Sequence, residues 1–354
     1  MTPPCGRGAR RFARPEQVSD GVSGVAASSL SAERGVALLM VLWIFLVLTV
    51  LVGEFSRGMR DDAVATRNLA EEIQARGVAM AAINLGIYRT LRARETDTEG
   101  ETETETDQAE RWPPDGTWHD GSYGGGRYSV RLIDEGGKIA LNRADETLLR
   151  RVFANLEIDQ DTQEFLTDAI LDWRDQDSLV RLHGAEDDYY LGLPQPYATK
   201  NGPFDSVEEL LLVRGMTREL VFGASASAAE RRDQPSIPLK EIFSVFSKTA
   251  NINVRTAPKA VLRALLGGAE EDVDDLIAAR AGDPASALTL MRAKIGDPII
   301  ARRLVDAVAS TLAIDARAVM QDGQIQARVG AVVDITEDAE GFHVARWFDR
   351  LPAL

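Results

Sequence analysis

The stretch that decides the fold is residues 33–54, which read Glu33-Arg34-Gly35-Val36-Ala37-Leu38-Leu39-Met40-Val41-Leu42-Trp43-Ile44-Phe45-Leu46-Val47-Leu48-Thr49-Val50-Leu51-Val52-Gly53-Glu54. No charged residue lies between Arg34 and Glu54, a run of 19 residues. A helix of about 20 apolar residues crosses the hydrocarbon core of a bilayer, and in lipid only a helix satisfies the backbone hydrogen bonds of such a segment. Buried core helices, the alternative, are usually shorter and rarely apolar on every side. The run therefore predicts a single membrane-spanning helix.

The residues on either side of the run indicate its orientation. Residues 1–34 contain five arginines and three acidic residues, so their net charge is +2 by count. Positive charge beside the first span stays in the cytoplasm, so we expect the long C-terminal part on the other side of the membrane. A secretory signal peptide would end in small residues of the Ala-x-Ala type, and no such site follows the run.

The start of the run resembles a known processing site. Gly35 follows Arg34 directly, and the apolar run that begins at Val36 contains the pattern Leu-Leu-x-Val-Leu over residues 38–42. This arrangement resembles the N-terminus of type IV pilins and type II secretion pseudopilins. The resemblance implies that a prepilin peptidase cleaves between Gly35 and Val36, removes residues 1–35 as a leader and methylates the new N-terminus.

The fifth position after the expected cleavage site departs from the usual pattern of that family. Most members have a glutamate there, thought to pair with the N-terminal amine of a neighbouring subunit, whereas this chain has Met40. A carboxylate at that depth costs roughly 2.5–3.5 kcal/mol, so it should persist only where it has a partner. A subunit at the tip has no subunit above it and can lack the glutamate. The chain is therefore similar to the minor pseudopilin family called general secretion pathway protein K.

The composition limits the classes of partner and of stabilising bond. The 354 residues carry a net charge of −15, which would become about −17 without the +2 leader. Such an acidic surface repels phosphate backbones and argues against nucleic-acid binding, whereas it is compatible with divalent cations. The only cysteine, Cys5, lies in the expected leader, so the processed chain would have neither a disulfide nor a cysteine zinc site.

Periodicity predicts the order of elements. Residues 36–94 are expected to form one helix, membrane-spanning and then amphipathic, and the acidic tract 95–111 is expected to be a disordered loop. Strand-like runs at 128–133 and 138–141 predict a hairpin around 134–137. Later strands are expected at 324–335 and 342–348, and helices over residues 147–155, 162–173, 207–214, 218–222, 258–266, 273–280 and 301–314.

These patterns predict an α+β chain with a pseudopilin fold. A long N-terminal transmembrane helix would pack on a small antiparallel sheet, and a large α-helical domain would be inserted between the strands. The expected divisions are sheet residues 112–143, the inserted domain 144–315 and sheet residues 316–354. This layout matches the protein K family, in which a large α-domain interrupts the pseudopilin fold.

The densest polar cluster lies between residues 172 and 190. Calcium binds six to eight oxygens, several of them carboxylates, on a loop that can wrap around the ion. Asp175 and Asp177, with Glu186 and Asp187 after a glycine, would supply such oxygens, although the spacing is not that of an EF-hand. From the residues alone, a metal site and a solvated acidic loop that pairs with nearby arginines both stay open.

A resemblance favours the metal. Residues 172–216 closely resemble the core of protein K, whose family is similar to a calcium-binding pseudopilin. This resemblance implies a structural calcium ion that locks the loop and docks its helices. If the loop is instead solvated, its acids would pair with Arg174 and Arg181. The implied calcium ligands are Asp175, Asp177, Glu186 and Asp187, with Asp172 as a further candidate.

Two other functions find little support. Residues 250–257 resemble the start of a helix-hairpin-helix DNA module, which would make the chain a membrane-anchored DNA-uptake protein. However, residues 267–272 are acidic where a basic hairpin is required, and we expect Asn251 and Asn253 to cap the helix and fix a turn. The three histidines are scattered and no catalytic motif is present, so we expect no enzymatic activity and propose no catalytic residue.

The resemblance as a whole implies a structural assembly protein. It places the chain at the tip of the type II secretion pseudopilus, where it would initiate or cap assembly and help to drive protein export across the outer membrane. The implied partners are the minor pseudopilins I and J, the major pseudopilin and the prepilin peptidase, and not nucleic acid. The implied location is the inner membrane, crossed once, with the globular domain in the periplasm.

Overall fold

The computed structural model describes most of the chain. The described residues are 30–99, 111–223, 237–267, 270–320, 326–336 and 341–349. Most of the expected leader and of the acidic tract, residues 1–29 and 100–110, lies outside them. The chain falls into two compact units, residues 1–67 and 68–354, and each is described by itself.

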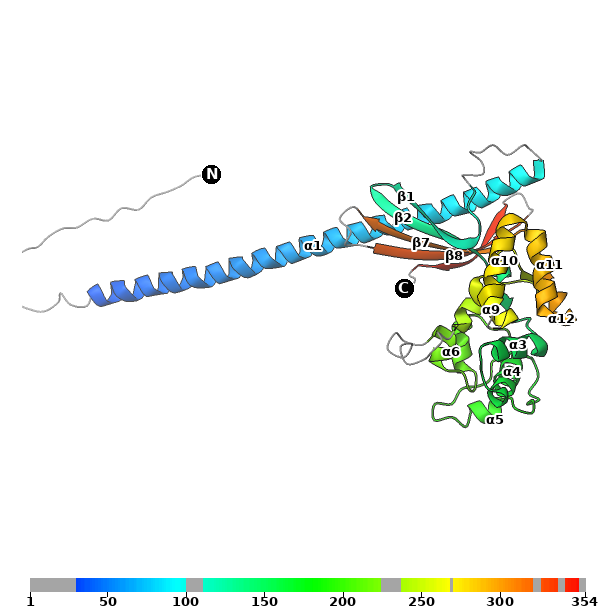
Figure 1. Cartoon of the computed structure of the whole chain (residues 1–354). Coiled ribbons are helices and arrows are strands. Elements are labelled where there is room, and N and C mark those ends of the chain that lie inside the picture. The colour runs from blue at the N-terminus through cyan, green and yellow to red at the C-terminus, as the bar shows by residue number, and fades with distance from the viewer. Residues whose placement is uncertain are drawn as a thin grey trace, which may run out of the picture. The chain divides into compact units, whose positions relative to one another are not determined.

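Helix α1 (Leu30–Glu99) begins in the first unit and ends in the second (Figure 1). Its segment Val36–Glu95 is long and apolar enough to cross a membrane, and the most apolar 18-residue window is 0% buried inside the protein. Leu38 and Trp43 in this segment are 74% and 69% exposed. Apolar side chains exposed at this density require an apolar environment. The length and composition of α1 thus agree with the predicted membrane-spanning helix.

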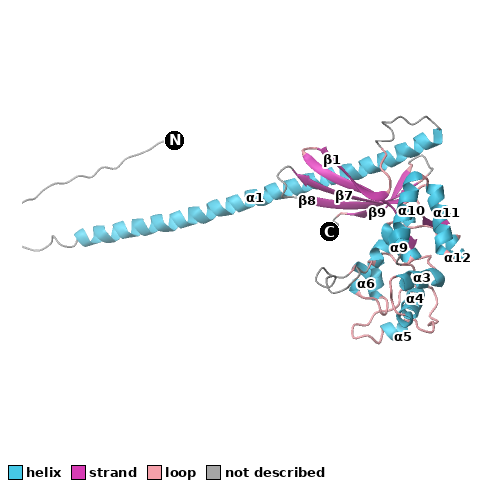
Figure 2. Cartoon of the chain, in the orientation of Figure 1, coloured by secondary structure: helices cyan, strands magenta, loops and turns pink. Residues whose placement is uncertain are grey.

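In the second unit, α1 covers one face of an antiparallel sheet (Figure 2). The helix residues buried there recur at the i, i+3, i+4 spacing predicted for an amphipathic helix. They pack against alternate residues of the strands, which point to the same face because strand side chains alternate. The buried helix residues are Ala75, Val78, Ala79, Ala82, Ile83 and Ile87, and the sheet residues include Val130, Leu132, Leu312, Ile314, Val329 and Val333.

The sheet has five strands in the order β1-β2-β7-β8-β9, and each neighbouring pair is antiparallel. Tyr123 pairs with Gly126, which leaves Gly124 and Gly125 as a two-residue turn with φ angles of 58° and 80°. Positive φ at both central positions is typical of the tight hairpin turn and favours glycine. The strands are β1 (Asp115–Tyr123), β2 (Gly126–Asp134), β7 (Thr311–Met320), β8 (Gln326–Ile335) and β9 (Phe342–Phe348).

The hairpin predicted around residues 134–137 is wrong. Strand β2 ends at Asp134, whose side chain caps the short 3₁₀ helix η1 (Glu135–Gly137). The next strand, β3 (Ile139–Ala140), pairs in parallel with β4 (Phe243–Ser244) outside the main sheet. The strand that forms a hairpin with β2 is β1, which contains two glycines and therefore carries little strand propensity.

A helical domain separates β2 from β7 and has its own hydrophobic core. Its first two helices begin at Asp145 and Asp159, each of which accepts a capping hydrogen bond from the first turn. A short parallel pair, β5 (Ile252–Asn253) and β6 (Leu304–Val305), lies near its end. The helices are α3 (Glu146–Asn155), α4 (Gln160–Arg174), α5 (Asp187–Tyr190), η2 (Val207–Leu212), α6 (Arg218–Phe222), α8 (Leu239–Ile242), α9 (Lys259–Leu266), α10 (Glu270–Gly282), α11 (Pro284–Ile295) and α12 (Pro298–Ala301).

The helix predicted over residues 301–314 is also wrong, because β7 begins at Thr311. Strand β7 lies between β2 and β8, and its residues Leu312, Ile314, Ala316 and Ala318 belong to the core under α1. Asp315 and Arg317 alternate with them, but this period of two lies almost wholly beyond residue 314, where the predicted helix ends. The predicted division at residue 315 therefore falls inside a strand. The predicted α+β class, with a long apolar helix over an antiparallel sheet, is confirmed.

Asp134 joins the sheet to the helical domain. The residue is 1% exposed, and its Oδ2 accepts hydrogen bonds from Asn253 Nδ2 at 2.8 Å and Thr256 Oγ1 at 2.6 Å. Asn253 also donates to the Ala307 carbonyl at 2.8 Å, in the segment that leads back to β7. Burial raises the pKa of Asp134, while the hydrogen bonds from Thr256 and Asn253 oppose that shift. We call these three side chains, Asp134, Asn253 and Thr256, the junction triad.

We predict that Asn253→Ala lowers the free energy of unfolding by about 2 kcal/mol, because it removes a donor from a buried carboxylate. The measurement is urea denaturation of the full chain in detergent micelles, followed by tryptophan fluorescence. Asn251→Ala is the matched control, since Asn251 is exposed and its change should stay within about 0.5 kcal/mol. Equal stability of the two variants would contradict the role given to the triad.

Candidate metal centre

The predicted acidic residues lie at the facing ends of α4 and α5 and on the loop between these helices. Asp172 is in the last turn of α4, and Asp175 is its C-terminal cap. Glu186 is the N-terminal cap of α5, and Asp187 is the first residue of that helix. Asp177 follows α4 on the exposed loop. The structure thus brings together residues that are separated by up to 15 positions in the sequence.

Asp172 anchors the loop to α4. It is 0% exposed, and its Oδ2 accepts hydrogen bonds from the N–H groups of Arg181 at 3.1 Å and Ala185 at 3.0 Å. The Arg181 Nε also lies 3.2 Å from Asp172 Oδ1. A Cβ at Gly184 would come within 1.9 Å of the Asp172 carboxylate, so only glycine lets the loop approach this closely.

Glu186 is buried without the donors that a carboxylate normally has. The residue is 6% exposed, and neither of its carboxylate oxygens accepts a well-formed hydrogen bond among the described residues, although the Thr199 hydroxyl lies close enough to lower its pKa. Asp175 Oδ1 and Asn201 Oδ1 in the same region are also buried without a hydrogen bond, as is the Thr199 hydroxyl, whereas Asp172 Oδ1 has the Arg181 guanidinium at 3.2 Å. Buried polar atoms are nearly always satisfied, so a cation or a donor at this place would stabilise the unsatisfied acceptors.

The pKa values of these acids are raised, as expected where positive charge is scarce. Burial raises the pKa of Glu186 to about 7, with a further contribution from the neighbouring Asp172 and Asp175, while the Thr199 hydroxyl opposes the shift. Burial likewise raises the pKa of Asp172 to about 6, although the N–H and the guanidinium of Arg181 oppose the shift. The pKa of Asp175 is raised by burial and then by Asp177. Like charges that repel one another in a buried place are stabilised when a cation binds.

The remaining predicted ligands have other hydrogen-bond partners. Asp177 Oδ1 accepts from the Leu179 N–H at 2.8 Å, and Asp187 Oδ1 accepts from the Thr199 N–H at 2.7 Å. Within the described ranges, no three His, Cys, Asp or Glu side chains form a ready-made metal cage. The structure therefore brings these acids into one region but does not arrange them as a single ligand set.

The alternative interpretation of paired arginines holds for one arginine and not for the other. Arg181 pairs with Asp172 and, at 3.6 Å, with Asp175. Arg174 instead donates to the backbone carbonyls of Leu141 and Ala144. One guanidinium is thus shared by two of the acids, and it leaves Glu186 without a partner among the described residues.

Sequence reasoning missed the residues that brace this loop from outside. Arg214 donates to the Gly184 carbonyl at 3.0 Å, and its guanidinium lies 4.3 Å from the Phe165 ring centre and 4.4 Å from that of Tyr189. Glu209 accepts from Trp173 Nε1 and from Lys200 Nζ, both at 2.8 Å. Arg214 and Glu209 lie within residues 172–216, the stretch that resembles protein K, and the sequence gives no other indication of their role.

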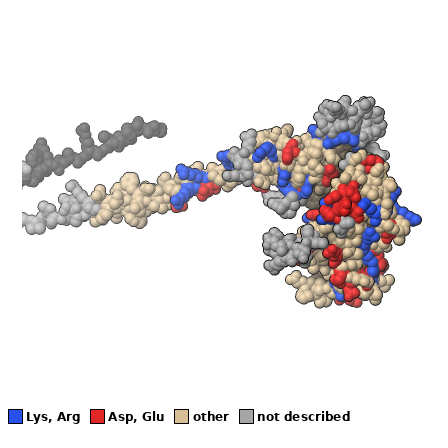
Figure 3. All heavy atoms as spheres, viewed as in Figure 1, with Lys and Arg blue, Asp and Glu red and all other residues tan. Residues whose placement is uncertain are grey.

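The candidate DNA module has a different structure from the one its sequence resembles. Asn253 belongs to the buried junction triad, and its Oδ1 accepts from the Arg255 N–H at 3.3 Å, as expected for a turn. The predicted capping role is wrong, because α9 begins after Pro258 without a side-chain cap. Acidic side chains gather over the region of α9 and α10, where DNA would have to approach (Figure 3).

Comparisons with known proteins give a consistent result. The family model for type II secretion system protein K matches residues 126–223. Protein K of Aeromonas hydrophila is 31% identical over 209 residues, covering 54% of this chain and 62% of the relative, and that of Pectobacterium carotovorum is 28% identical over 198 residues, covering 54% and 60%. The chain thus spans about three-fifths of these curated relatives.

A solved structure is also similar to the chain. It is the GspK–GspI–GspJ complex of the type II secretion system of enterotoxigenic Escherichia coli. One of its chains matches with a TM-score of 0.49 and 16% identity, covering 83% of this chain and 99% of that one.

We predict that the metal-free chain becomes less stable as the pH rises from about 4, near the ordinary pKa values of these carboxyls, to about 7. The raised pKa values of Asp172 and Glu186 mean that the folded state holds their protons more tightly than the unfolded state does, so ionisation at higher pH costs stability. The measurement is the free energy of unfolding against pH in excess chelator. Glu186→Gln should weaken the dependence, and a stability that rises through this range would contradict the prediction.

Proposed function

The chain belongs to the protein K family of the type II secretion system, and we propose that it is a minor pseudopilin at the tip of the secretion pseudopilus. There it would initiate or cap assembly and so contribute to protein export across the outer membrane. The observation that carries this proposal is the match of residues 126–223 to protein K. The candidate membrane span of α1 supports it, because a pseudopilin needs one.

We further propose that the chain is anchored once in the inner membrane, with its second unit in the periplasm. The arginines of residues 1–34 support this orientation. Cleavage between Gly35 and Val36 by the prepilin peptidase, followed by methylation, would leave the exposed apolar segment at the new N-terminus. The bond in question lies in the second turn of α1, next to that segment.

The proposed partners are those of the protein K family, namely the minor pseudopilins I and J and the major pseudopilin. Met40 is 65% exposed on α1 and lies in the segment that would meet lipid or another subunit helix. Because an apolar residue stands where other subunits have a glutamate, the chain offers no carboxylate to the N-terminal amine of a subunit beside it. This difference supports a position at the tip.

We propose a structural calcium ion between α4 and α5. Glu186 and Asp175 would supply the principal ligands, since both have buried oxygens without a hydrogen-bond partner in the described part of the chain. Asp172, Asp177 and Asp187 would complete the acidic surroundings. When bound, the ion would supply positive charge that holds the loop and the two helices together. Several hard oxygen donors and no thiol fit calcium better than a softer metal.

The tip position can be tested at Met40. We predict that Met40→Glu lowers secretion about tenfold in a host that relies on this chain as its protein K, because the new carboxylate would lack a partner at that depth. Recovery of minor pseudopilins I and J with the chain should fall in parallel. Met59→Glu is the matched control, because Met59 is also exposed on α1 but lies beyond the apolar run. Unchanged secretion and recovery with Met40→Glu would contradict the tip position.

Calcium binding can be tested by melting the full chain in detergent micelles. We predict that calcium in about tenfold excess over its Kd raises the Tm by about 3 °C or more. Glu186→Gln and Asp175→Asn should abolish the increase, and Asp188→Asn, an exposed neighbour, should retain it. An increase that survives all three substitutions, or no increase in the parent chain, would contradict the site without bearing on the family.

A further inference from the structure

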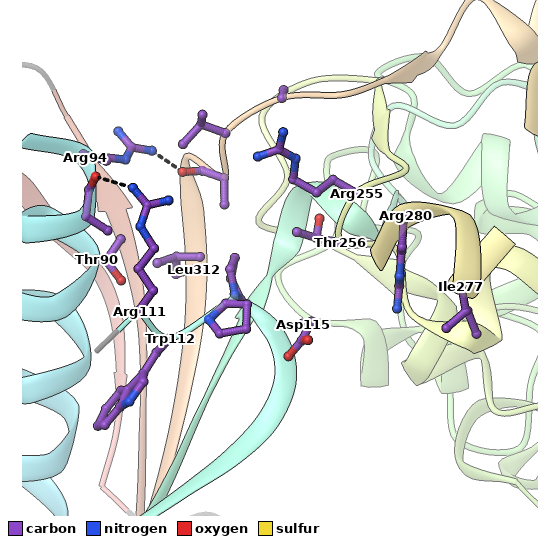
Figure 4. Close-up of a pocket in the computed structure, with 16 residues that line it drawn as sticks. Thr90, Arg94, Arg111, Trp112, Asp115, Arg255, Thr256, Ile277, Arg280 and Leu312 are labelled. Atoms are coloured by element: carbon purple, nitrogen blue, oxygen red, sulfur yellow. Dashed lines mark hydrogen bonds between the residues drawn. The ribbon is translucent and has the colours of Figure 1, made fainter. Parts of the chain in front are cut away.

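Hydrogen bonds hold polar side chains of the second unit in place even where it is hollow. A cavity of about 600 Å³ is lined by the end of α1, the segment that enters β1 and the segment that enters β7 (Figure 4). Among its lining residues, Arg94 donates to the Ala309 carbonyl and Arg111 donates to the Ala93 carbonyl at 3.2 Å. A buried polar atom that lacks any such contact in the described part of the chain departs from the usual arrangement.

The side-chain amide of Asn201 shows such a departure. The residue is half-buried in the segment between α5 and η2, and its amide forms no hydrogen bond with any of the described residues. Other asparagines are held. The Asn142 amide donates to the Phe204 carbonyl at 3.0 Å and accepts from the Phe204 N–H at 2.7 Å. The Asn155 amide donates to the Ala264 carbonyl at 2.9 Å. The Asn201 side chain is therefore free to turn toward its own backbone.

The N–H group that follows Asn201 is also without a hydrogen bond in the described ranges. It belongs to Gly202, and Asn201-Gly202 is the only Asn–Gly pair in the sequence. Glycine has no Cβ to shield its nitrogen or to restrict its backbone. Asn201 itself has a φ of 47°, in the left-handed region that asparagine tolerates better than most residues. The side-chain carbon of Asn201 and the nitrogen of Gly202 can thus approach each other.

We propose that Asn201 is a site of spontaneous deamidation in the folded chain. The Gly202 nitrogen attacks Cγ of Asn201 and gives up its proton, while the bond from Cγ to Nδ2 breaks and Nδ2 leaves as ammonia. A cyclic succinimide remains, in which Cγ is joined to the Gly202 nitrogen. Water then opens the ring, at Cγ to give aspartate or at the backbone carbonyl carbon to give isoaspartate. The net reaction converts an amide and water into a carboxylate and ammonia.

The reaction would change the charge beside the candidate metal centre. Thr199 lies two positions before Asn201, and its N–H donates to Asp187 Oδ1 at 2.7 Å. A carboxylate at position 201 adds a negative charge to this acidic region, and isoaspartate also lengthens the main chain by a carbon atom. Since like charges repel, either product should make the metal-free chain less stable. The reaction itself requires no metal ion, so its failure would be distinguishable from failure of the calcium site.

The test is mass spectrometry of the full chain, kept in detergent micelles at neutral pH and sampled over several weeks. We expect the peptide that contains residues 201 and 202 to gain about 1 Da and to separate into an aspartate and an isoaspartate form. Gly202→Ala should slow this gain about tenfold, because a methyl group shields the nitrogen and restricts the backbone. The fold should tolerate this change, since a Cβ at Gly202 would lie 3.7 Å from the Lys200 carbonyl oxygen, an ordinary contact.

A second Asn–Gly pair separates the effect of the structure from that of the sequence. Arg143→Gly places a glycine after Asn142, at an exposed position whose N–H donates to the Ala140 carbonyl at 2.9 Å. In the folded chain Asn142 should stay unmodified, because Phe204 holds its amide, whereas both pairs should react in urea. An Asn201 that reacts in urea but not in the folded chain would overturn the proposal. Equal modification of Asn142 and Asn201 in the folded variant would also overturn it, and either result leaves the protein K assignment intact.

Discussion

The buried carboxylate of Asp134 lies at the point where the sheet becomes the helical domain. It accepts one hydrogen bond from its own turn and two from Asn253 and Thr256, which lie about 120 positions further along the chain. A carboxylate at 1% exposure is stable only with such donors, so the two parts of the second unit must meet in one arrangement. The chain can therefore leave the sheet after β2, build a separate core and return at β7.

Other buried or partly buried acids of the second unit also have hydrogen-bond donors, which makes an acid with too few donors informative. Asp315 on β7 lies between Arg131 and Arg328, and Glu209 accepts from a tryptophan, a lysine and a backbone N–H. Each of these acids has donors that the fold supplies. Glu186 is 6% exposed against 7% for Asp315, yet no arginine, lysine or backbone N–H of the described residues donates to it, and Arg181 pairs with its neighbours instead. Among these buried acids, those with too few donors lie together at the ends of α4 and α5, which favours a candidate metal centre there and not at Asp134 or Asp315.

Local patterns predicted most of the fold, and the errors share one cause. Hydrophobic periodicity lies within one contiguous stretch of sequence for the apolar run, the amphipathic half of α1 and the helices α3, α4 and α9. The strands β1 and β7 were missed in whole or in part, because β1 contains two glycines and β7 follows directly on a stretch that fits a helical period. Their structure is decided by partners that are distant in sequence, such as the pairing of Ser129 with Arg317, and no local period reports such pairings.

The candidate site could be predicted only in part for a similar reason. Asp172, Asp175 and Glu186 stand out in the sequence because acids are dense there, and the structure does bring them together. The contacts of Arg214 with Phe165 and Gly184 could not be found, because they depend on the packing of α4 against the loops that follow it. The spacing of acids along the sequence identifies which carboxylates are available to a metal ion. Their burial in the folded chain decides which of them lack a hydrogen-bond partner.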